Sequence, residues 1–125
     1  MTGVQSLIEH ASSGIHRTSD ADDAEQLARE NNWRVVDLDT RNAHDKASFL
    51  AVCRSAFDLP DWFGNNWDAL EDSLTDVDTR PGVLVLWRGA GSLDESTREV
   101  ATDILAERGR RAERGLAPFL VLLVH

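Results

Sequence analysis

Apolar and polar positions along the chain predict an α/β fold with three buried strands. The segment 33–38 (WRVVDL) is rich in β-branched residues, 83–87 (VLVLW) is continuously apolar, and 118–124 (PFLVLLV) is nearly so. Runs of this length, bounded by turn residues, are typical of strands. A continuous apolar run further indicates a strand covered on both faces, as in a parallel sheet.

Segments with helical periodicity separate these strands. Between residues 46 and 57 apolar positions recur at i, i+3, i+4 and i+7, and Asp45 precedes them as a helix cap. A second helix is expected to begin at Asn66 with Asn65 as its cap, and a third to begin after a cap at Ser92 and to end at a glycine. With right-handed crossovers, this order predicts a small three-stranded parallel sheet flanked by helices.

Residues 1–32 show weaker periodicity and are expected to form a helical N-terminal extension packed on a domain of residues 33–125. A short helix is predicted from Val4 to Ala11, ending at a Ser-Ser-Gly sequence. In the acidic stretch that follows, Ser19 or Asp20 would cap a second helix, with carboxylates near its positive end.

Charge gives a first indication of function. The chain of 125 residues, a length typical of one domain, carries 22 acidic and 13 basic residues, for a formal net charge of −9. Such a surface repels phosphate backbones and anionic lipid, so we expect neither nucleic-acid binding nor membrane binding. A basic protein would be attracted instead.

Several kinds of site are not expected. The single cysteine, Cys53, excludes an intrachain disulfide and a CxxC motif, and its place on an apolar helical stripe indicates an inert core thiol. The histidines lack metal-ligand spacing, so we expect no metal and no cofactor. The N-terminus has no basic region followed by a long apolar stretch, and the run 119–124 is too short to cross a membrane. We therefore expect a cytoplasmic protein.

The segment 58–78 (DLPDWFGNNWDALEDSLTDVD) contains the candidate site. It has seven acidic residues and no Lys or Arg. At about 100° per residue, one side of its helix is apolar and is expected to be buried; its members are Trp67, Leu70, Leu74 and Val77. Another side is acidic and polar; Asp68, Asp72 and Thr75 fall on it, flanked by Glu71 and Asp76. Like charges at i, i+4 repel, so a face of one sign is expected to bind something positive.

The residues just before this helix also suggest an interface. Trp62 and Phe63 are large aromatics in an acidic loop, and protein interfaces favour such anchors. Gly64 indicates a turn with positive φ or a close approach by another backbone. Trp67 and the strand residue Trp87 lie on apolar stripes instead, which predicts that both belong to the core.

The string LPDWFGNNWDALEDSLTD resembles the signature of the barstar family, the small intracellular inhibitors of secreted microbial ribonucleases. The matching elements are Pro60, Trp62-Phe63, Gly64, Asn66, Asp68-Ala69-Leu70, Asp72, Leu74 and Thr75. The Leu86-Trp87-Arg88 sequence and the last apolar strand also fit, so the resemblance covers residues 33–124.

The resemblance implies a three-stranded parallel sheet and a helix that, with its preceding loop, plugs the active site of a barnase-type extracellular ribonuclease in a 1:1 complex, the free protein being a monomer. Asp72 would lie where the substrate phosphate binds, facing arginines and the catalytic histidine. Asp68 would pair with an arginine of the guanine-binding loop, and Trp62 would lie against the histidine. Asn66 and Thr75 would lie in the same patch.

Three positions depart from the family pattern. Trp62-Phe63 stands where members may carry a Tyr pair, Glu71 where a Trp can stand, and the segment 108–114 is rich in arginine where some members have a further acidic contact.

Two alternatives stay open. In the first alternative to a ribonuclease inhibitor, the chain is a barstar-like immunity or regulatory module that binds a different basic protein. In the second, it is a hydrolase whose helix carboxylates hold a divalent cation or act as acid and base. The second is disfavoured because catalytic carboxylate pairs normally lie in a cleft.

Overall fold

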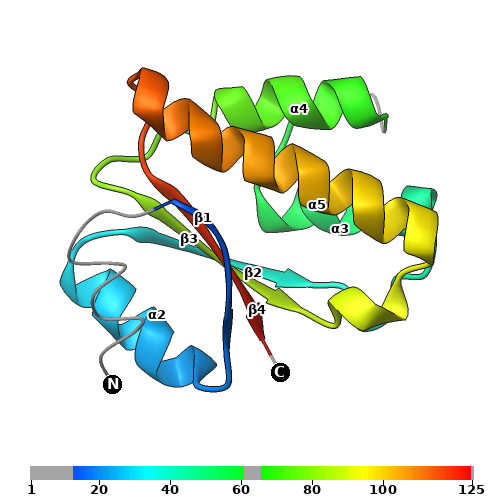
Figure 1. Ribbon diagram of the computed structural model, residues 1–125, viewed down its shortest axis with the longest axis horizontal. Helices are drawn as coiled ribbons and strands as arrows, with labels where there is room; N and C mark the ends of the chain where they lie inside the picture. The colour runs from blue at the N-terminus through cyan, green and yellow to red at the C-terminus, as the bar shows by residue number, and fades with distance from the viewer. Residues whose placement is uncertain (1–12, 61–65, 125) are drawn as a thin grey trace.

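The fold is a parallel sheet with helices on both faces. The computed structural model describes residues 13–60 and 66–124, and Figure 1 shows how its elements are arranged. The helix predicted over residues 4–11, the predicted cap Asn65, and Trp62, Phe63 and Gly64 lie outside the described residues.

Four strands form the sheet. They are β1 (Gly14–Thr18), β2 (Arg34–Asp39), β3 (Val83–Arg88) and β4 (Phe119–Val124). Their order is β1-β4-β3-β2, and all three pairings are parallel. β2, β3 and β4 are the predicted strands, so the parallel α/β class is confirmed.

The prediction of three strands was wrong, because β1 adds a fourth. β1 pairs with β4 from Gly14 opposite Leu120 to Thr18 opposite Val124. Its sequence, GIHRT, has exposed His16 and Arg17 and only one buried residue, Thr18. An edge strand of this kind is held by backbone hydrogen bonds to a distant strand, so its own residue pattern carries little signal. The predicted helical extension therefore contains a strand, and its division from the domain at residue 33 stays a prediction.

Helices cover both faces of the sheet. α3 (Lys46–Ala56), α4 (Trp67–Thr75) and α5 (Glu95–Arg110) lie on one face, and α2 (Ala21–Glu30) lies on the other. Alternate side chains of the two central strands enter the two layers. Leu84, Leu86, Leu120 and Leu122 pack with α2, whereas Val83, Val85, Trp87, Phe119 and Val121 pack with the three helices. This confirms that the apolar strands are covered on both sides.

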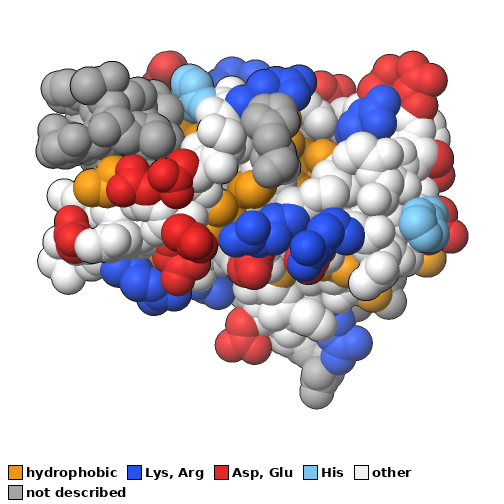
Figure 2. Space-filling model, turned by 90° about the horizontal axis from the view of Figure 1, so that it is seen from below, with side chains coloured by type: hydrophobic (Ala, Val, Ile, Leu, Met, Phe, Trp, Pro, Cys, Tyr) orange, Lys and Arg blue, Asp and Glu red, His pale blue; other side chains and the backbone are white. Residues whose placement is uncertain are grey.

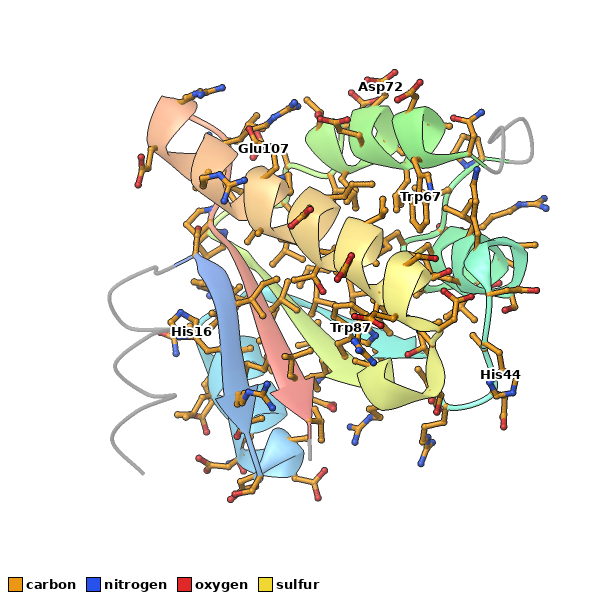
Figure 3. All side chains as sticks on the ribbon, turned by 45° about the vertical axis from the view of Figure 1, so that its right-hand side comes forward. His16, His44, Trp67, Asp72, Trp87 and Glu107 are labelled. Carbon is orange, nitrogen blue, oxygen red and sulfur yellow. The ribbon has the colours of Figure 1, made fainter. Side chains whose placement is uncertain are left out.

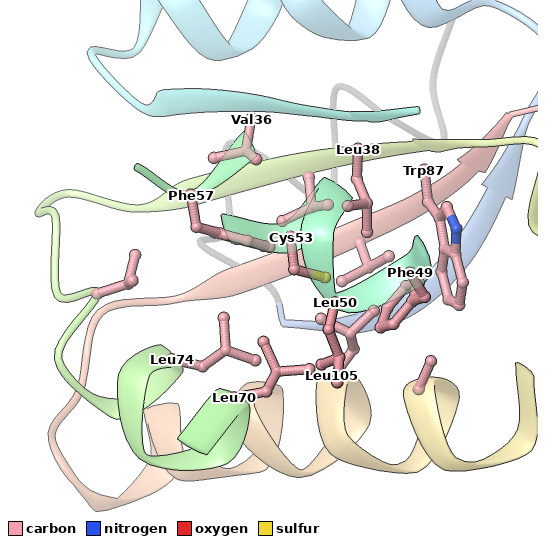
Figure 4. Packing of buried hydrophobic residues seen from close by; sticks show 14 of the residues in the cluster. Val36, Leu38, Phe49, Leu50, Cys53, Phe57, Leu70, Leu74, Trp87 and Leu105 are labelled. Atoms are coloured by element: carbon pink, nitrogen blue, oxygen red, sulfur yellow. The ribbon is translucent and has the colours of Figure 1, made fainter. Parts of the chain in front are cut away.

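The larger core lies between the sheet and the three helices, as Figure 4 shows. Its centre is formed by fully buried residues of α3, α4 and α5: Phe49, Leu50, Cys53, Leu70, Leu74 and Leu105. Cys53 is fully buried in this cluster, so its predicted place in the core is confirmed, and this burial raises the pKa of its thiol.

The helices begin at capping residues close to the predicted ones. Asp45 and Ser48 form a reciprocal capping box at the start of α3, and Asp20 caps α2. For α5 the predicted cap was wrong: Asp94 accepts the hydrogen bond from Thr97 N at 2.8 Å. Ser92 lies in a preceding 3-10 turn, and the extended Leu93 between them delays the helix.

Candidate protein-binding surface

The α4 helix is built by a cap at one end and an apolar stripe along one side. Asn66, rather than Asn65, is the cap, and its Oδ1 accepts a hydrogen bond from Ala69 N at 2.7 Å. Asp68 lies in the first turn, where the helix dipole favours a carboxylate. Leu70 and Leu74 are buried against the core. The predicted buried side of this helix is confirmed.

The opposite side of α4 faces solvent. Asp68, Asp72 and Asp76 are exposed, and Figure 3 shows Asp72 on the outer side of the helix, directed away from the rest of the molecule. None of the ion pairs between described residues includes any of these three carboxylates. They form a set of negative charges on a helix whose other side is fixed in the core; we call Asp68, Asp72 and Asp76 the acidic face.

The surface over α2 differs from the acidic face. Figure 2 shows the side of the molecule opposite α4, where basic and acidic side chains are interspersed. On α2, for example, Arg29 Nε lies 3.0 Å from Glu25 Oε2 in an i, i+4 ion pair. Mixed signs of this kind are typical of a solvated helix, so the single sign of the acidic face is not a general property of this protein's helices.

Glu71 and Thr75 lie at the edge of α4 that borders the end of α5. Arg111, the first residue after α5, donates from Nη1 to Thr75 Oγ1, and its Nη2 lies 3.4 Å from Glu71 Oε1. Thr75 Oγ1 in turn donates to the Glu71 main-chain oxygen at 3.1 Å. The acidic segment has no basic residue of its own, but the fold brings one to it from a distant part of the chain. We call Arg111, Glu71 and Thr75 the arginine clamp.

A short network of charges continues from the clamp onto α5. Glu107 accepts a hydrogen bond from Arg110 Nε at 2.9 Å and lies 3.9 Å from Arg111 Nε. The hydrogen bond from Arg110, with the positive charges of Arg110, Arg114 and Arg111, lowers the pKa of the Glu107 carboxyl. In Figure 3, Glu107 lies near the facing end of α4. This edge of the surface is therefore nearly balanced in charge, unlike the acidic face.

A buried arginine holds the C-terminal end of α4. Arg108 is 2% exposed and donates to the main-chain oxygens of Leu74, Val77 and Ala117 at 2.9, 2.7 and 3.1 Å. Its guanidinium also lies 4.9 Å from the centre of the Phe119 ring. A cation at the carbonyl end of a helix is favoured by the helix dipole. Arg108 thus joins the end of α4 to α5 and β4.

Trp87 belongs to the core, as predicted, whereas Trp67 is partly buried and packs against the core. Trp87 is 1% exposed and donates from Nε1 to Thr40 Oγ1 at 3.0 Å. Trp67, at the start of α4, is half-buried, its ring centre 5.8 Å from that of Phe49, and Lys46 Nζ lies 5.8 Å from the Trp67 ring centre. The first turn of α4 is therefore held against α3 by the aromatic contact between Trp67 and Phe49.

Part of the predicted site lies outside the residues that the structure describes. Trp62, Phe63 and Gly64 are not among the described residues, and their partner contacts stay predictions. The same holds for the partner contacts of Asn66, Asp68, Glu71, Asp72, Thr75 and Asp76, although the structure does show where these residues lie. Among the described residues, no cluster of three or more His, Cys, Asp or Glu is placed to hold a metal ion. None of the described helices is both long and apolar enough to span a membrane.

Arg108 and Arg111 were not predicted to be parts of this surface. In the sequence they stand out only as members of the arginine-rich segment 108–114. Their spacing of three residues places them on neighbouring positions of one helical side, and this was the available signal. It does not say which helix they face, because that depends on how α5 packs against α4.

Fold and surface together define a small α/β protein with a parallel sheet and an exposed acidic helix. The family model described as Barstar (barnase inhibitor) matches residues 33–124. Because this match spans most of the chain, the protein belongs to the barstar family, and the resemblance found in the sequence is confirmed. A comparison with curated proteins gave no match.

Proposed function

We propose that this protein is an intracellular inhibitor, or immunity protein, of a secreted guanyl-preferring ribonuclease, acting in the cytoplasm as a 1:1 complex. The acidic face of α4, with the preceding loop, would occupy the enzyme's active site. One observation carries the proposal: Asp68 and Asp72 are exposed carboxylates on a helix that is fixed at both ends. The family to which the chain belongs, described as barnase inhibitors, supports it.

Physical chemistry explains why such a surface suits a ribonuclease. An enzyme that cleaves a phosphodiester must present cations to the phosphate, and a carboxylate placed at the same point can pair with those cations. Because the inhibitor's helix is already anchored by Asn66, Trp67 and Arg108, little ordering is required on binding. The preorganised carboxylates can then use most of their interaction energy for affinity.

The proposed roles differ along the surface. Asp72 would lie at the phosphate position, facing the enzyme's arginines and catalytic histidine, and Asp68 would pair with an arginine of the guanine-binding loop. Trp62 and Phe63 would contact the enzyme beside the acidic face. The inhibitor would perform no chemistry itself, and its negative charge would disfavour direct contact with RNA or a membrane.

A titration tests the proposal. Purified protein is added to each member of a panel of guanyl-preferring microbial ribonucleases, and RNA cleavage is followed. We expect complete inhibition of at least one enzyme at a molar ratio near one. Two results would contradict active-site blockage: inhibition that needs a large molar excess, or equal inhibition by an unrelated acidic protein of similar net charge.

A second candidate keeps the surface and changes the partner. The acidic face suits any protein that presents a matching pair of cations, so a different basic protein remains a candidate target. A panel of ribonucleases that are all uninhibited, together with a stoichiometric complex between this protein and another purified basic protein, would favour it. Asp72→Ala should weaken that complex as well.

A further inference from the structure

Two of the residues predicted to contact the partner are engaged within the chain. Thr75 Oγ1 donates to the Glu71 main-chain oxygen and accepts from Arg111. The Glu71 carboxylate lies beside the same guanidinium, with a side chain 43% exposed against 28% for Arg111. A partner that used Glu71 Oε1 or Thr75 Oγ1 would compete with Arg111 for the same atoms. The acidic face, by contrast, has no such competitor among the described residues.

The positive charge of Arg111 is unfavourable for attracting a basic partner. Arg111 places a cation at the border of a surface whose proposed partner is itself basic, so its charge opposes long-range attraction. If Arg111 nevertheless increases the affinity for the partner, it must do so through its contacts within the protein and not through the association rate. These contacts join the C-terminal half of α4 to the end of α5 through one guanidinium.

Resting on the proposed function, we propose that Arg111 is a positioning residue of the inhibitor surface. It holds the Glu71–Thr75 edge of α4 against α5, and this fixes the orientation in which Asp68 and Asp72 meet the partner. Glu71 and Thr75 then belong to the arginine clamp rather than to the set of direct charge contacts. The planar fork of the guanidinium is needed, because it must reach a hydroxyl and a carboxylate at once.

Three variants separate position from charge. Arg111→Gln removes both the clamp and a positive charge. Arg111→Lys keeps the charge and removes the fork. Arg110→Gln is the matched control, because it makes the same charge change one residue away, at an exposed side chain that pairs with Glu107 on its own helix.

The first measurement uses the free protein and needs no partner. Amide hydrogen exchange under native conditions reports the local opening of each helix. We expect Arg111→Gln and Arg111→Lys to speed exchange of the α4 amides by roughly three- to tenfold, the range for losing a partly exposed charged hydrogen bond. The amides of the buried strand β3 should change little, and Arg110→Gln should match the wild type in α4. Unchanged α4 exchange in both Arg111 variants would overturn the proposal.

The second measurement uses stopped-flow binding to a ribonuclease that the wild type inhibits. Arg111→Gln should raise the dissociation rate by roughly three- to tenfold while leaving the association rate equal or faster, because a repelling charge is gone. Arg111→Lys should raise only the dissociation rate, and Arg110→Gln should leave it unchanged. An unchanged dissociation rate in both Arg111 variants would overturn the link to binding. If no ribonuclease binds, the proposed function fails, and hydrogen exchange still decides whether Arg111 positions α4.

Discussion

Arg108 donates from Nε to the main-chain oxygen of Leu74 at 2.9 Å, from a position that is 2% exposed. This contact joins the last turn of the acidic helix to the interior of α5. A buried guanidinium is costly unless its donors are satisfied, and here three carbonyl groups accept from it. The orientation of α4 is therefore tied to the packing of the whole helical layer.

The first prediction concerns this buried arginine. Arg108→Met keeps a long side chain but removes the guanidinium that donates to the oxygens of Val77 and Ala117; the Leu74 oxygen keeps a hydrogen bond from Val77 N at 3.2 Å. We expect a loss of about 2–4 kcal/mol in the free energy of unfolding, because each unsatisfied buried acceptor costs about 1–3 kcal/mol. Urea unfolding followed by tryptophan fluorescence measures it. Arg98→Met on the same helix is the control, and equal unfolding midpoints for the two variants would contradict the role of Arg108.

The second prediction concerns the fourth strand. A Cβ on Gly109 of α5 would lie 2.9 Å from Gly14 N and 3.3 Å from Phe119 O, so backbone would have to move. Gly109→Ala should destabilise the fold by about 1–3 kcal/mol, the usual range for overpacking, even though alanine favours a helix by about 1 kcal/mol. Exchange of the β1 amides should rise most.

Gly91→Ala provides the control for that substitution. No heavy atom lies within 4 Å of a Cβ built at Gly91, so its unfolding free energy should stay close to that of the wild type. Equal unfolding free energies for Gly109→Ala and Gly91→Ala, together with unchanged hydrogen exchange of the β1 amides, would contradict the close packing of β1 against α5.

The third prediction concerns acid stability at the end of β2. Hydrogen bonds from the Arg41 side chain and backbone, with the charges of Arg41 and Arg88, lower the pKa of Asp39 to about 2. A carboxyl whose folded pKa is depressed stabilises the fold above its unfolded pKa, and this contribution is lost as pH falls through the folded value. Asp39→Asn should therefore be less stable than the wild type at pH 7.

Urea midpoints at pH 7, 4, 3 and 2 measure this difference. It should shrink between about pH 4 and pH 2 as Asp39 takes up its proton in the wild type. A difference between Asp39→Asn and the wild type that stays constant over this range would show that the carboxylate charge is not the cause.

The fourth prediction concerns the rate at which the inhibitor meets a ribonuclease. Exposed charges act over about 10 Å at 0.1 M salt and about 3 Å at 1 M. The association rate should fall by roughly tenfold or more over this range, with a smaller change in dissociation. Stopped-flow measurements at several salt concentrations test this. An association rate independent of salt would contradict electrostatic steering by the acidic face.

Local sequence patterns predicted most of the fold because the buried elements carry strong periodicity. In β3 and β4, residues such as Leu84 and Val85 are buried on opposite faces, which produces the continuous apolar runs in the sequence. In α4, Leu70 and Leu74 recur with helical spacing. β1 was missed because its strand conformation depends on pairing with β4, about a hundred residues away, and not on its own side chains.

The acidic face was predictable for a similar reason, and the arginine clamp was not. Asp68 and Asp72 lie one helical turn apart, so their common face follows from the helix alone. The contact between Arg111 and Thr75 joins two elements that meet only in the folded protein. Charge patterning within one segment therefore overstated how much of α4 is free for a partner.

The most direct test of the central claim is the affinity of Asp72→Ala for a ribonuclease that the wild type inhibits. Asp22→Ala is its control, an exposed aspartate on α2 on the other face of the sheet. Removing one member of a buried, hydrogen-bonded charge pair costs about 2–5 kcal/mol in protein complexes, because the other member is left buried and unpaired. We therefore expect the dissociation constant to rise by roughly 30- to 5000-fold for Asp72→Ala and to stay near the wild-type value for Asp22→Ala. Equal affinities for Asp72→Ala and the wild type would contradict the claim that the acidic face of α4 occupies the active site.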